Sequence, residues 1–169
     1  LMLWDGFPSG ADIGLHNSVI YSITGHGNVD FFYNFFHMGG GISLTFPGYH
    51  IFTSSIILMT GLPDYIAQTF VVSLFSSLIV LAAFLITKHV WSEPAAYIVA
   101  FLAAISRFDI EMLMWGGYPN VITLLLIPLT LYLFVQKKRF SNVPFLVTGS
   151  ILAGSIFLTH SLSAAVFVA

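Results

Sequence analysis

An aspartate and a histidine four residues apart are the first candidates for chemistry in this chain. Asp12 and His16 follow the turn-forming residues Pro8, Ser9 and Gly10. If a helix begins at Asp12, one turn separates the two side chains and both lie on one face. The carboxylate could then act as a general base toward a hydroxyl or amine acceptor, and with the imidazole it could hold a divalent cation such as Mg or Mn. Alternatively, Asp12 is only a helix N-cap and His16 only a polar surface residue.

Three further candidates lie at the start of an apolar run or within one. Tyr49 and His50 follow the turn signal Pro47-Gly48, where they either bind substrate or serve as interfacial residues at a helix start. His160 lies near the middle of the last apolar run, which starts near Val143 and carries no charge. An ionisable residue inside a membrane is a functional candidate, whereas a histidine at a helix end near the interface needs no such role.

A second polar stretch begins at Arg107. Arg107, Asp109 and Glu111 form a local ion pair, or else Arg107 holds an anionic phosphate while Glu111 supplies a second acid or metal ligand. Tyr118 and Asn120 follow a Trp-Gly-Gly sequence. These two residues either bind polar groups of a ligand or belong to an interfacial loop with aromatic anchors.

The composition indicates that a membrane surrounds these side chains. Hydrophobic residues make up 57% of the 169 residues and charged residues only 7%, whereas soluble domains average roughly 25% charged residues. Twelve charges could not cover a soluble protein of this size, so the chain is predicted to be an all-α integral membrane protein. The net charge of -2 argues against a nucleic-acid partner, and the lack of cysteine excludes disulfides and thiolate ligands.

Residues 1–45 are interrupted by charges, histidines and glycines, and we expect a large loop on the membrane surface. Apolar spacing predicts an amphipathic helix over about 12–24 within it, ended by glycine. The next segment, 46–62, is apolar but short: its run to residue 60 reaches roughly 22 Å as a helix, less than the ~30 Å hydrocarbon core. It is therefore predicted to be a juxtamembrane or half-membrane helix.

The remaining residues, 63–169, are predicted to form a transmembrane bundle in a single domain. Its spans are expected at about 64–88, 93–107, 118–136 and 142–158, followed by a truncated last helix. Both ends of the chain look cut, so we expect a fragment of a larger multi-span protein.

The basic residues predict an orientation in the cell membrane. Lys137, Lys138 and Arg139 mark residues 137–141 as cytoplasmic under the positive-inside rule. Counting spans backward places 107–118, predicted as a polar loop, outside and 88–93 inside. Residues 1–62 then also lie outside, provided that 46–60 does not cross the membrane.

Several short motifs resemble the first half of GT-C membrane glycosyltransferases, relatives of oligosaccharyltransferase and protein O-mannosyltransferase. They are Pro-x-Gly-x-Asp-x-x-x-His at 8–16, Phe-Pro-Gly-Tyr-His at 46–50 and Thr-Gly-Leu-Pro at 60–63. Trp-Gly-Gly-Tyr-Pro at 115–119 and Thr-His-Ser at 159–161 look like a prokaryotic, often archaeal, branch described as 6-pyruvoyl-tetrahydropterin synthase-related membrane proteins.

This resemblance implies a multi-span helical fold whose first outer loop carries juxtamembrane helices. It also implies transfer of a hexosyl or pentosyl group from a polyprenyl-phosphate donor to an acceptor at the outer face. The acidic residue of that loop maps to Asp12, with Asp5 as second choice, and the later acid to Asp109 or Glu111. This chain has Pro47-Gly48 where many relatives have a Pro-Pro pair.

Two other functions are compatible with the same sequence. A transporter or flippase-like bundle would carry ionisable groups deep in its spans, and His160 is the one candidate. A non-catalytic membrane protein with the same fold would turn Asp12 and His16 away from any cavity. The sequence indicates neither the sugar, the acceptor nor the oligomeric state.

Overall fold

The structure, a computed structural model, is built from helices whose ends coincide with glycine, proline and polar residues. It describes residues 3–4, 7–8, 10, 12–27 and 47–168. The α-helices in this part are α1 (Ile13–His26), α2 (Gly48–Thr60), α3 (Asp64–Val90), α4 (Glu93–Ala104), α5 (Arg107–Trp115), α6 (Tyr118–Val135), α7 (Asn142–Thr159) and α8 (Ser161–Val168). Two strands of two residues, β1 (Leu3–Trp4) and β2 (Phe7–Pro8), pair antiparallel, and a 3-10 turn, η1 (Lys137–Arg139), separates α6 from α7.

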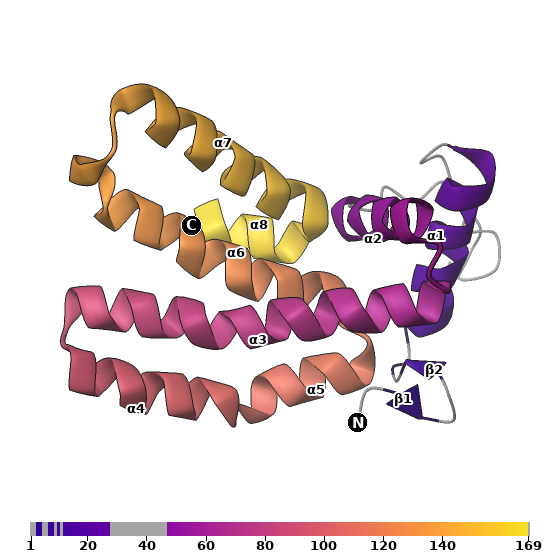
Figure 1. Ribbon diagram of the computed structural model, residues 1–169, viewed down its shortest axis with the longest axis horizontal. Helices are drawn as coiled ribbons and strands as arrows, with labels where there is room; N and C mark the ends of the chain where they lie inside the picture. The colour runs from indigo at the N-terminus through magenta and orange to yellow at the C-terminus, as the bar shows by residue number, and fades with distance from the viewer. Residues whose placement is uncertain (1–2, 5–6, 9, 11, 28–46, 169) are drawn as a thin grey trace.

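The long helices lie side by side along the longest axis of the molecule, and α1 crosses one end of them (Figure 1). Helix α2 lies at the same end, between α1 and the end of α7. Helix α8 folds back beside α6. Within the described residues, α3, α6 and α7 are each long and apolar enough to cross a membrane, which indicates a multi-span membrane protein.

The helices predicted over about 12–24 and over 46–62 are present, as α1 and α2. Gly27 and Gly61 end them in the left-handed conformation, with φ of 68° at each. In both cases the glycine N–H donates to the carbonyl four residues earlier, which only a residue tolerant of positive φ allows without strain. Residues 28–46, including the rest of the predicted loop, lie outside the described residues.

The prediction of a polar loop over residues 107–118 is wrong, because residues 107–115 form helix α5. Helix α4 has only 12 residues, about 18 Å, and is too short to cross the membrane alone. After a break at Ile105 and Ser106, α5 continues toward the end of the bundle where α1 lies and packs against α6, while α4 packs along α3 (Figure 1). Charged residues do not prevent a helix near the membrane boundary, where their side chains can reach water.

Large apolar side chains cover the outside of the bundle. Phe70, Leu81, Phe101, Leu146 and Ile151 are each more than half exposed. Patches of this extent on α3, α4 and α7 fit a surface that faces lipid rather than water.

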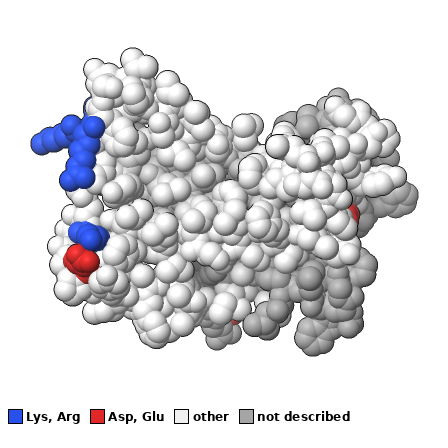
Figure 2. All heavy atoms as spheres, viewed as in Figure 1, with Lys and Arg blue, Asp and Glu red and all other residues white. Residues whose placement is uncertain are grey.

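The two ends of the bundle differ in their charged residues. Lys137, Lys138 and Arg139 gather at one end, close to the ion pair between Lys88 and Glu93, whose Nζ and Oε2 atoms are 3.1 Å apart (Figure 2). We call this the basic end. The opposite end, where α1 and α2 lie, is called the α1 end.

Candidate functional site

The segment that leads into α1 is held against the end of α5. The backbone N–H of Asp12 donates to the Trp115 carbonyl at 3.4 Å. Gly10 has a φ of 138°, and a Cβ atom placed on it would stand only 2.4 Å from the backbone nitrogen of Gly116. Glycine is therefore required at position 10 both by conformation and by the close approach of the two backbones.

Asp12 occupies the N-cap position of α1, but its side chain makes no capping hydrogen bond. The residue is exposed at the α1 end. The Asp12 carboxylate therefore does not cap α1, and the prediction that it serves only as an N-cap is wrong. Glu111 lies on α5 one turn before Trp115, the residue whose carbonyl binds the Asp12 backbone, and is half-buried.

His16 joins three elements that are far apart in the sequence. Its Nε2 atom lies 2.8 Å from the carbonyl oxygen of Gly116, and its Nδ1 atom lies 2.9 Å from Nε2 of His50 on α2. Its side chain is buried. His16 is therefore not the exposed polar residue of the alternative interpretation, since it connects α1, α2 and the end of α5.

These contacts determine where the protons lie on the two histidines. A carbonyl only accepts, so Nε2 of His16 carries hydrogen and donates to Gly116. In a neutral His16 the Nδ1 atom is then an acceptor, and Nε2 of His50 must donate to it. Nδ1 of His50 is left as a buried acceptor with no partner among the described side chains.

Burial keeps this histidine pair neutral. Desolvation lowers the pKa of His16, although the Gly116 carbonyl and the Asp12 carboxylate both oppose the shift. Desolvation together with the nearby His16 lowers the pKa of His50 to about 3. Both imidazoles are therefore neutral at pH 7, as the tautomer assignment requires.

Two tyrosines complete the buried cluster around His16. The ring of Tyr118 stacks on His16 at a centroid distance of 5.6 Å, and the ring of Tyr49 meets it edge-on at 5.2 Å. Burial raises the pKa of Tyr49, so its phenol stays protonated and donates to Oε1 of Gln68 at 3.1 Å. Gln68 in turn donates through Nε2 to Asn17 of α1.

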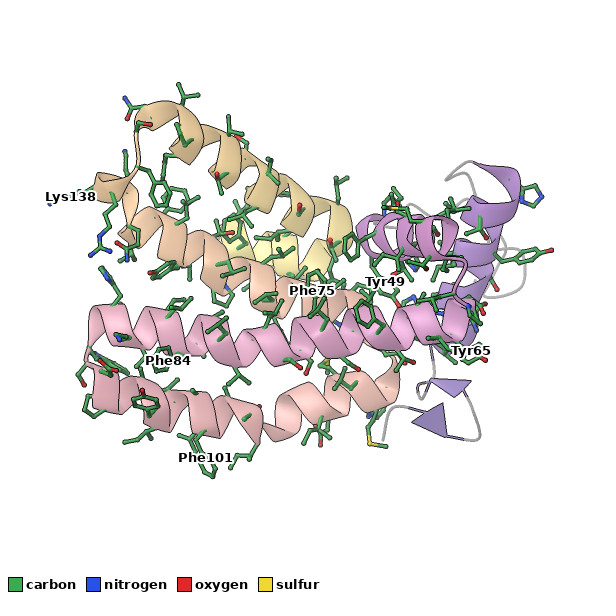
Figure 3. The ribbon with its side chains drawn as sticks, viewed as in Figure 1. Tyr49, Tyr65, Phe75, Phe84, Phe101 and Lys138 are labelled. Atoms are coloured by element: carbon green, nitrogen blue, oxygen red, sulfur yellow. The ribbon has the colours of Figure 1, made fainter. Side chains whose placement is uncertain are left out.

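An apolar groove of about 400 Å³ begins at Tyr49 and runs between α2, α3, α6 and α7. Phe52 and Phe75 both line it and contact each other edge to face, with ring centroids 5.7 Å apart. Figure 3 shows Tyr49 and Phe75 next to one another between the helices. The groove therefore starts at the buried cluster and extends into the part of the bundle that faces hydrocarbon.

The structure brings together four of the predicted site residues, namely His16, Tyr49, His50 and Tyr118. Asn120 is half-buried in the first turn of α6, close to this cluster along the chain. The side chains of Arg107 and Asp109 lie outside the described residues. Whether any of these residues binds substrate stays a prediction.

His160 belongs to a separate group. It lies in extended backbone between α7 and α8, where its Nδ1 atom accepts from the N–H of Ser163 at 3.2 Å and so caps α8. The Ser163 hydroxyl lies 2.9 Å from the same atom and 2.9 Å from Thr123 of α6. His160 is therefore placed at a helix break rather than in the middle of a span.

The Mg or Mn ion suggested for Asp12 and His16 does not fit the described residues. Both ring nitrogens of His16 are already engaged, and a metal ligand needs a free nitrogen lone pair. The described residues also contain no group of three or more His, Cys, Asp or Glu side chains able to hold a metal ion.

Sequence reasoning missed Gln68, Asn17 and Gly116, which hold the cluster together. Gln68 is completely buried within a long uncharged run, and a lone amide in such a run signals a partner on a neighbouring helix. No comparable signal marks the carbonyl of Gly116, because any residue has one.

The chain was compared with known proteins at three levels. No protein-family model, no curated protein and no solved structure matches it. A function has therefore to be inferred from this chain's own residues.

Proposed function

We propose that this chain is the N-terminal membrane part of a GT-C-type glycosyltransferase. It would transfer a sugar from a polyprenyl-phosphate donor to an acceptor at the α1 end, on the outer face of the membrane. The observation that carries the proposal is the apolar groove that ends at Tyr49, within the cluster that positions α1 and Asp12. A lipid-linked sugar needs an apolar channel for its lipid and an acid near its sugar. Asp12 does not line the groove, but the contact of Tyr49 with His16 links the groove to the helix that follows Asp12.

The groove would hold the first isoprene units of the donor. Its lining is mostly aromatic and aliphatic, with Ile122 and Leu126 of α6 facing Leu158 of α7. Apolar chains gain binding free energy in proportion to the surface they remove from water or from weaker contacts, and they need no hydrogen bonds. The lining contains few hydroxyls. Ser55 donates to the carbonyl of Ile51 in its own helix, and a serine in a helix such as Ser155 can form the same kind of bond.

Asp12 would act as the general base. Its carboxylate is exposed and makes no capping bond, so it can accept the proton of an acceptor hydroxyl. The acceptor oxygen then bonds to the anomeric carbon while the bond from that carbon to the lipid phosphate breaks, through an oxocarbenium-like transition state. Glu111 is proposed as the second acid, and Arg107 as the cation that stabilises the leaving phosphate.

The buried cluster would act as a positioning device rather than as part of the chemistry. His16 and Gly116 fix α1 to α5, and Tyr49, Gln68 and Asn17 fix α1 and α2 to α3. These contacts hold the Asp12 backbone against α5, where the second acid Glu111 also lies. A catalytic carboxylate needs such a rigid support, because a misplacement of 1 Å can reduce the rate by about a hundredfold.

The test is sugar transfer by the full-length protein from a set of polyprenyl-phosphate-linked sugars. Asp12→Asn should lower the transfer rate by about 10²- to 10⁴-fold, the range that general-base catalysis contributes. Asp64→Asn is the matched control, since Asp64 is another acid at the α1 end and accepts from the N–H of its neighbour Tyr65. Undiminished transfer by the Asp12 variant, at equal expression and thermal stability, would remove Asp12 from the mechanism.

A further inference from the structure

A hollow of about 550 Å³ opens at the basic end, beside the turn that joins α6 to α7. It is lined by His89 at the end of α3 and by the continuous stretch 134–139. The residues around it include all three cations of the turn, Lys137, Lys138 and Arg139. Figure 2 shows the basic side chains gathered on this end of the bundle, and Figure 3 shows Lys138 extending from it.

The three cations lie in one 3-10 turn and repel one another. The nearby acid Glu93 already pairs with Lys88 at 3.1 Å, and no ion pair joins any described carboxylate to the cations of the turn. Nζ of Lys137 lies over the ring of Phe145 at 5.4 Å, which leaves Lys138 and Arg139 as the freer charges. An anion in the hollow would relieve this repulsion.

One wall of the hollow is apolar. Phe134 and Val135, the last residues of α6, line it and are each at least half exposed. They stand directly before the cationic turn, so an apolar surface and a positively charged rim meet at the point where a membrane-spanning helix ends. The phosphate of a phospholipid lies at this depth in a bilayer, with its acyl chains beside the helix.

We propose that this hollow binds the phosphate headgroup of an anionic membrane lipid. Arg139 would form paired hydrogen bonds to the phosphate oxygens and Lys138 would add a second charge. The acyl chains would follow Phe134 and Val135 along α6. Basic pockets between transmembrane helices are known as sites for anionic lipid headgroups. This site is independent of the proposed sugar transfer, which belongs to the other end.

Calorimetric titration of the purified full-length protein in detergent tests the proposal. The probe is dioctanoyl phosphatidylglycerol, with dioctanoyl phosphatidylcholine and inorganic phosphate as separate arms. Binding should favour phosphatidylglycerol over both. The double variant Lys138→Gln/Arg139→Gln should bind it about 30-fold more weakly, from roughly fivefold for each basic residue near the membrane surface. Lys88→Gln, which removes a cation from the same end but not from the hollow, should change binding by less than about twofold.

Three outcomes would overturn the proposal. They are equal binding of phosphatidylcholine, binding of inorganic phosphate as tight as that of the lipid, and unchanged lipid binding by the double variant. If the double variant does not fold, the unmodified protein still provides a test. Raising the salt concentration from about 0.1 M to 1 M shortens the screening length from roughly 10 Å to 3 Å, so phosphatidylglycerol binding should weaken while phosphatidylcholine binding does not.

Discussion

The two ends of this bundle are built in opposite ways. At the α1 end, polar side chains are buried and joined across long stretches of sequence, as His16 is to Gly116, 100 residues away. At the basic end, the charged residues are exposed and Lys88 pairs with nearby Glu93, although the buried Gln136 also contacts His89 across 47 residues. The α1 end is therefore held together by several buried long-range contacts, whereas the basic end combines one such contact with exposed charges in its turns.

This difference indicates where precise positioning matters. Burying polar groups is costly unless each finds a partner, so a fold that does it at one end obtains a rigid arrangement there. The exposed acid Asp12 stands on that rigid end. The basic end needs only to hold positive charge near the membrane surface, which flexible side chains do well.

The largest effect is expected from a substitution that separates the segment before α1 from α5. Gly10→Ala should lower the free energy of unfolding by about 2–4 kcal/mol, because the new Cβ would overlap the Gly116 backbone and the φ of 138° would be strained. It should also reduce the proposed sugar transfer as much as Asp12→Asn does, since Asp12 would move. Thermal and denaturant unfolding in detergent measures the first effect.

Gly14→Ala is the matched control for this variant. A Cβ atom at Gly14 would meet nothing within 4 Å, and the residue is exposed in the first turn of α1. Stability should stay the same or rise by up to about 1 kcal/mol, because alanine favours a helix. Equal losses in the two glycine variants would mean that the close approach of Gly10 and Gly116 is not what holds the α1 end together.

The next largest effect is the loss of folding stability at low pH. Because the folded-state pKa of His50 is about 3, below the ordinary value of 6.5, the unfolded chain binds more protons between these pH values. Stability should therefore be constant above pH 6.5 and fall as the pH drops below it, by roughly 2 kcal/mol at pH 5 for His50 alone. His16, whose pKa is also lowered, changes stability in the same direction.

Unfolding measured from pH 8 to pH 4.5 checks this dependence. His50→Gln should flatten the slope, although it also lowers stability at pH 7 by leaving His16 without its donor. His26→Gln removes an exposed imidazole from the end of α1 and should leave the slope as it is. A slope that survives in His50→Gln and disappears in His26→Gln would contradict the buried neutral pair.

A smaller effect is expected from the tyrosine that links the cluster to the groove. Tyr49→Phe removes the bond to Gln68 and leaves a buried amide oxygen without its donor, at a cost of about 1–2 kcal/mol. Tyr21→Phe should cost close to nothing, since Tyr21 is 73% exposed. Adding Gln68→Leu to Tyr49→Phe should not add a full second loss, and a fully additive double variant would show that the two side chains are not coupled.

The helices of this fold could be predicted from local signals. Long apolar runs predicted α3, α6 and α7, and glycines predicted the ends of α1 and α2. Helix α5 was missed because Arg107 and Glu111 were interpreted as loop residues. The position of α5 depends on the end of α4 and on the contacts of Gly10 and Asp12 with residues 115–116, and neither has a local signature in the sequence.

The buried cluster could be predicted only in part. Its members His16, Tyr49, His50 and Tyr118 were recognised as unusual side chains at segment boundaries, and they do meet. Their burial was not predicted, because the partners that make it tolerable include a backbone carbonyl and an amide on another helix, Gln68. Residue type indicates where polar groups occur, whereas the tertiary fold decides which of them pair.

The smallest effect is expected at the basic end, and it sharpens the contrast with Tyr49. Lys88 and Glu93 form an ion pair of 3.1 Å, but both side chains are about half exposed. Water already solvates both charges, so Lys88→Gln should change the free energy of unfolding by less than about 1 kcal/mol, and the change should shrink further at high salt. Unfolding in detergent at low and high salt measures this. If Lys88→Gln lowered the free energy of unfolding more than Tyr49→Phe does, the charged turns would contribute more to stability than the buried cluster. The α1 end would then not be the rigid part of the molecule.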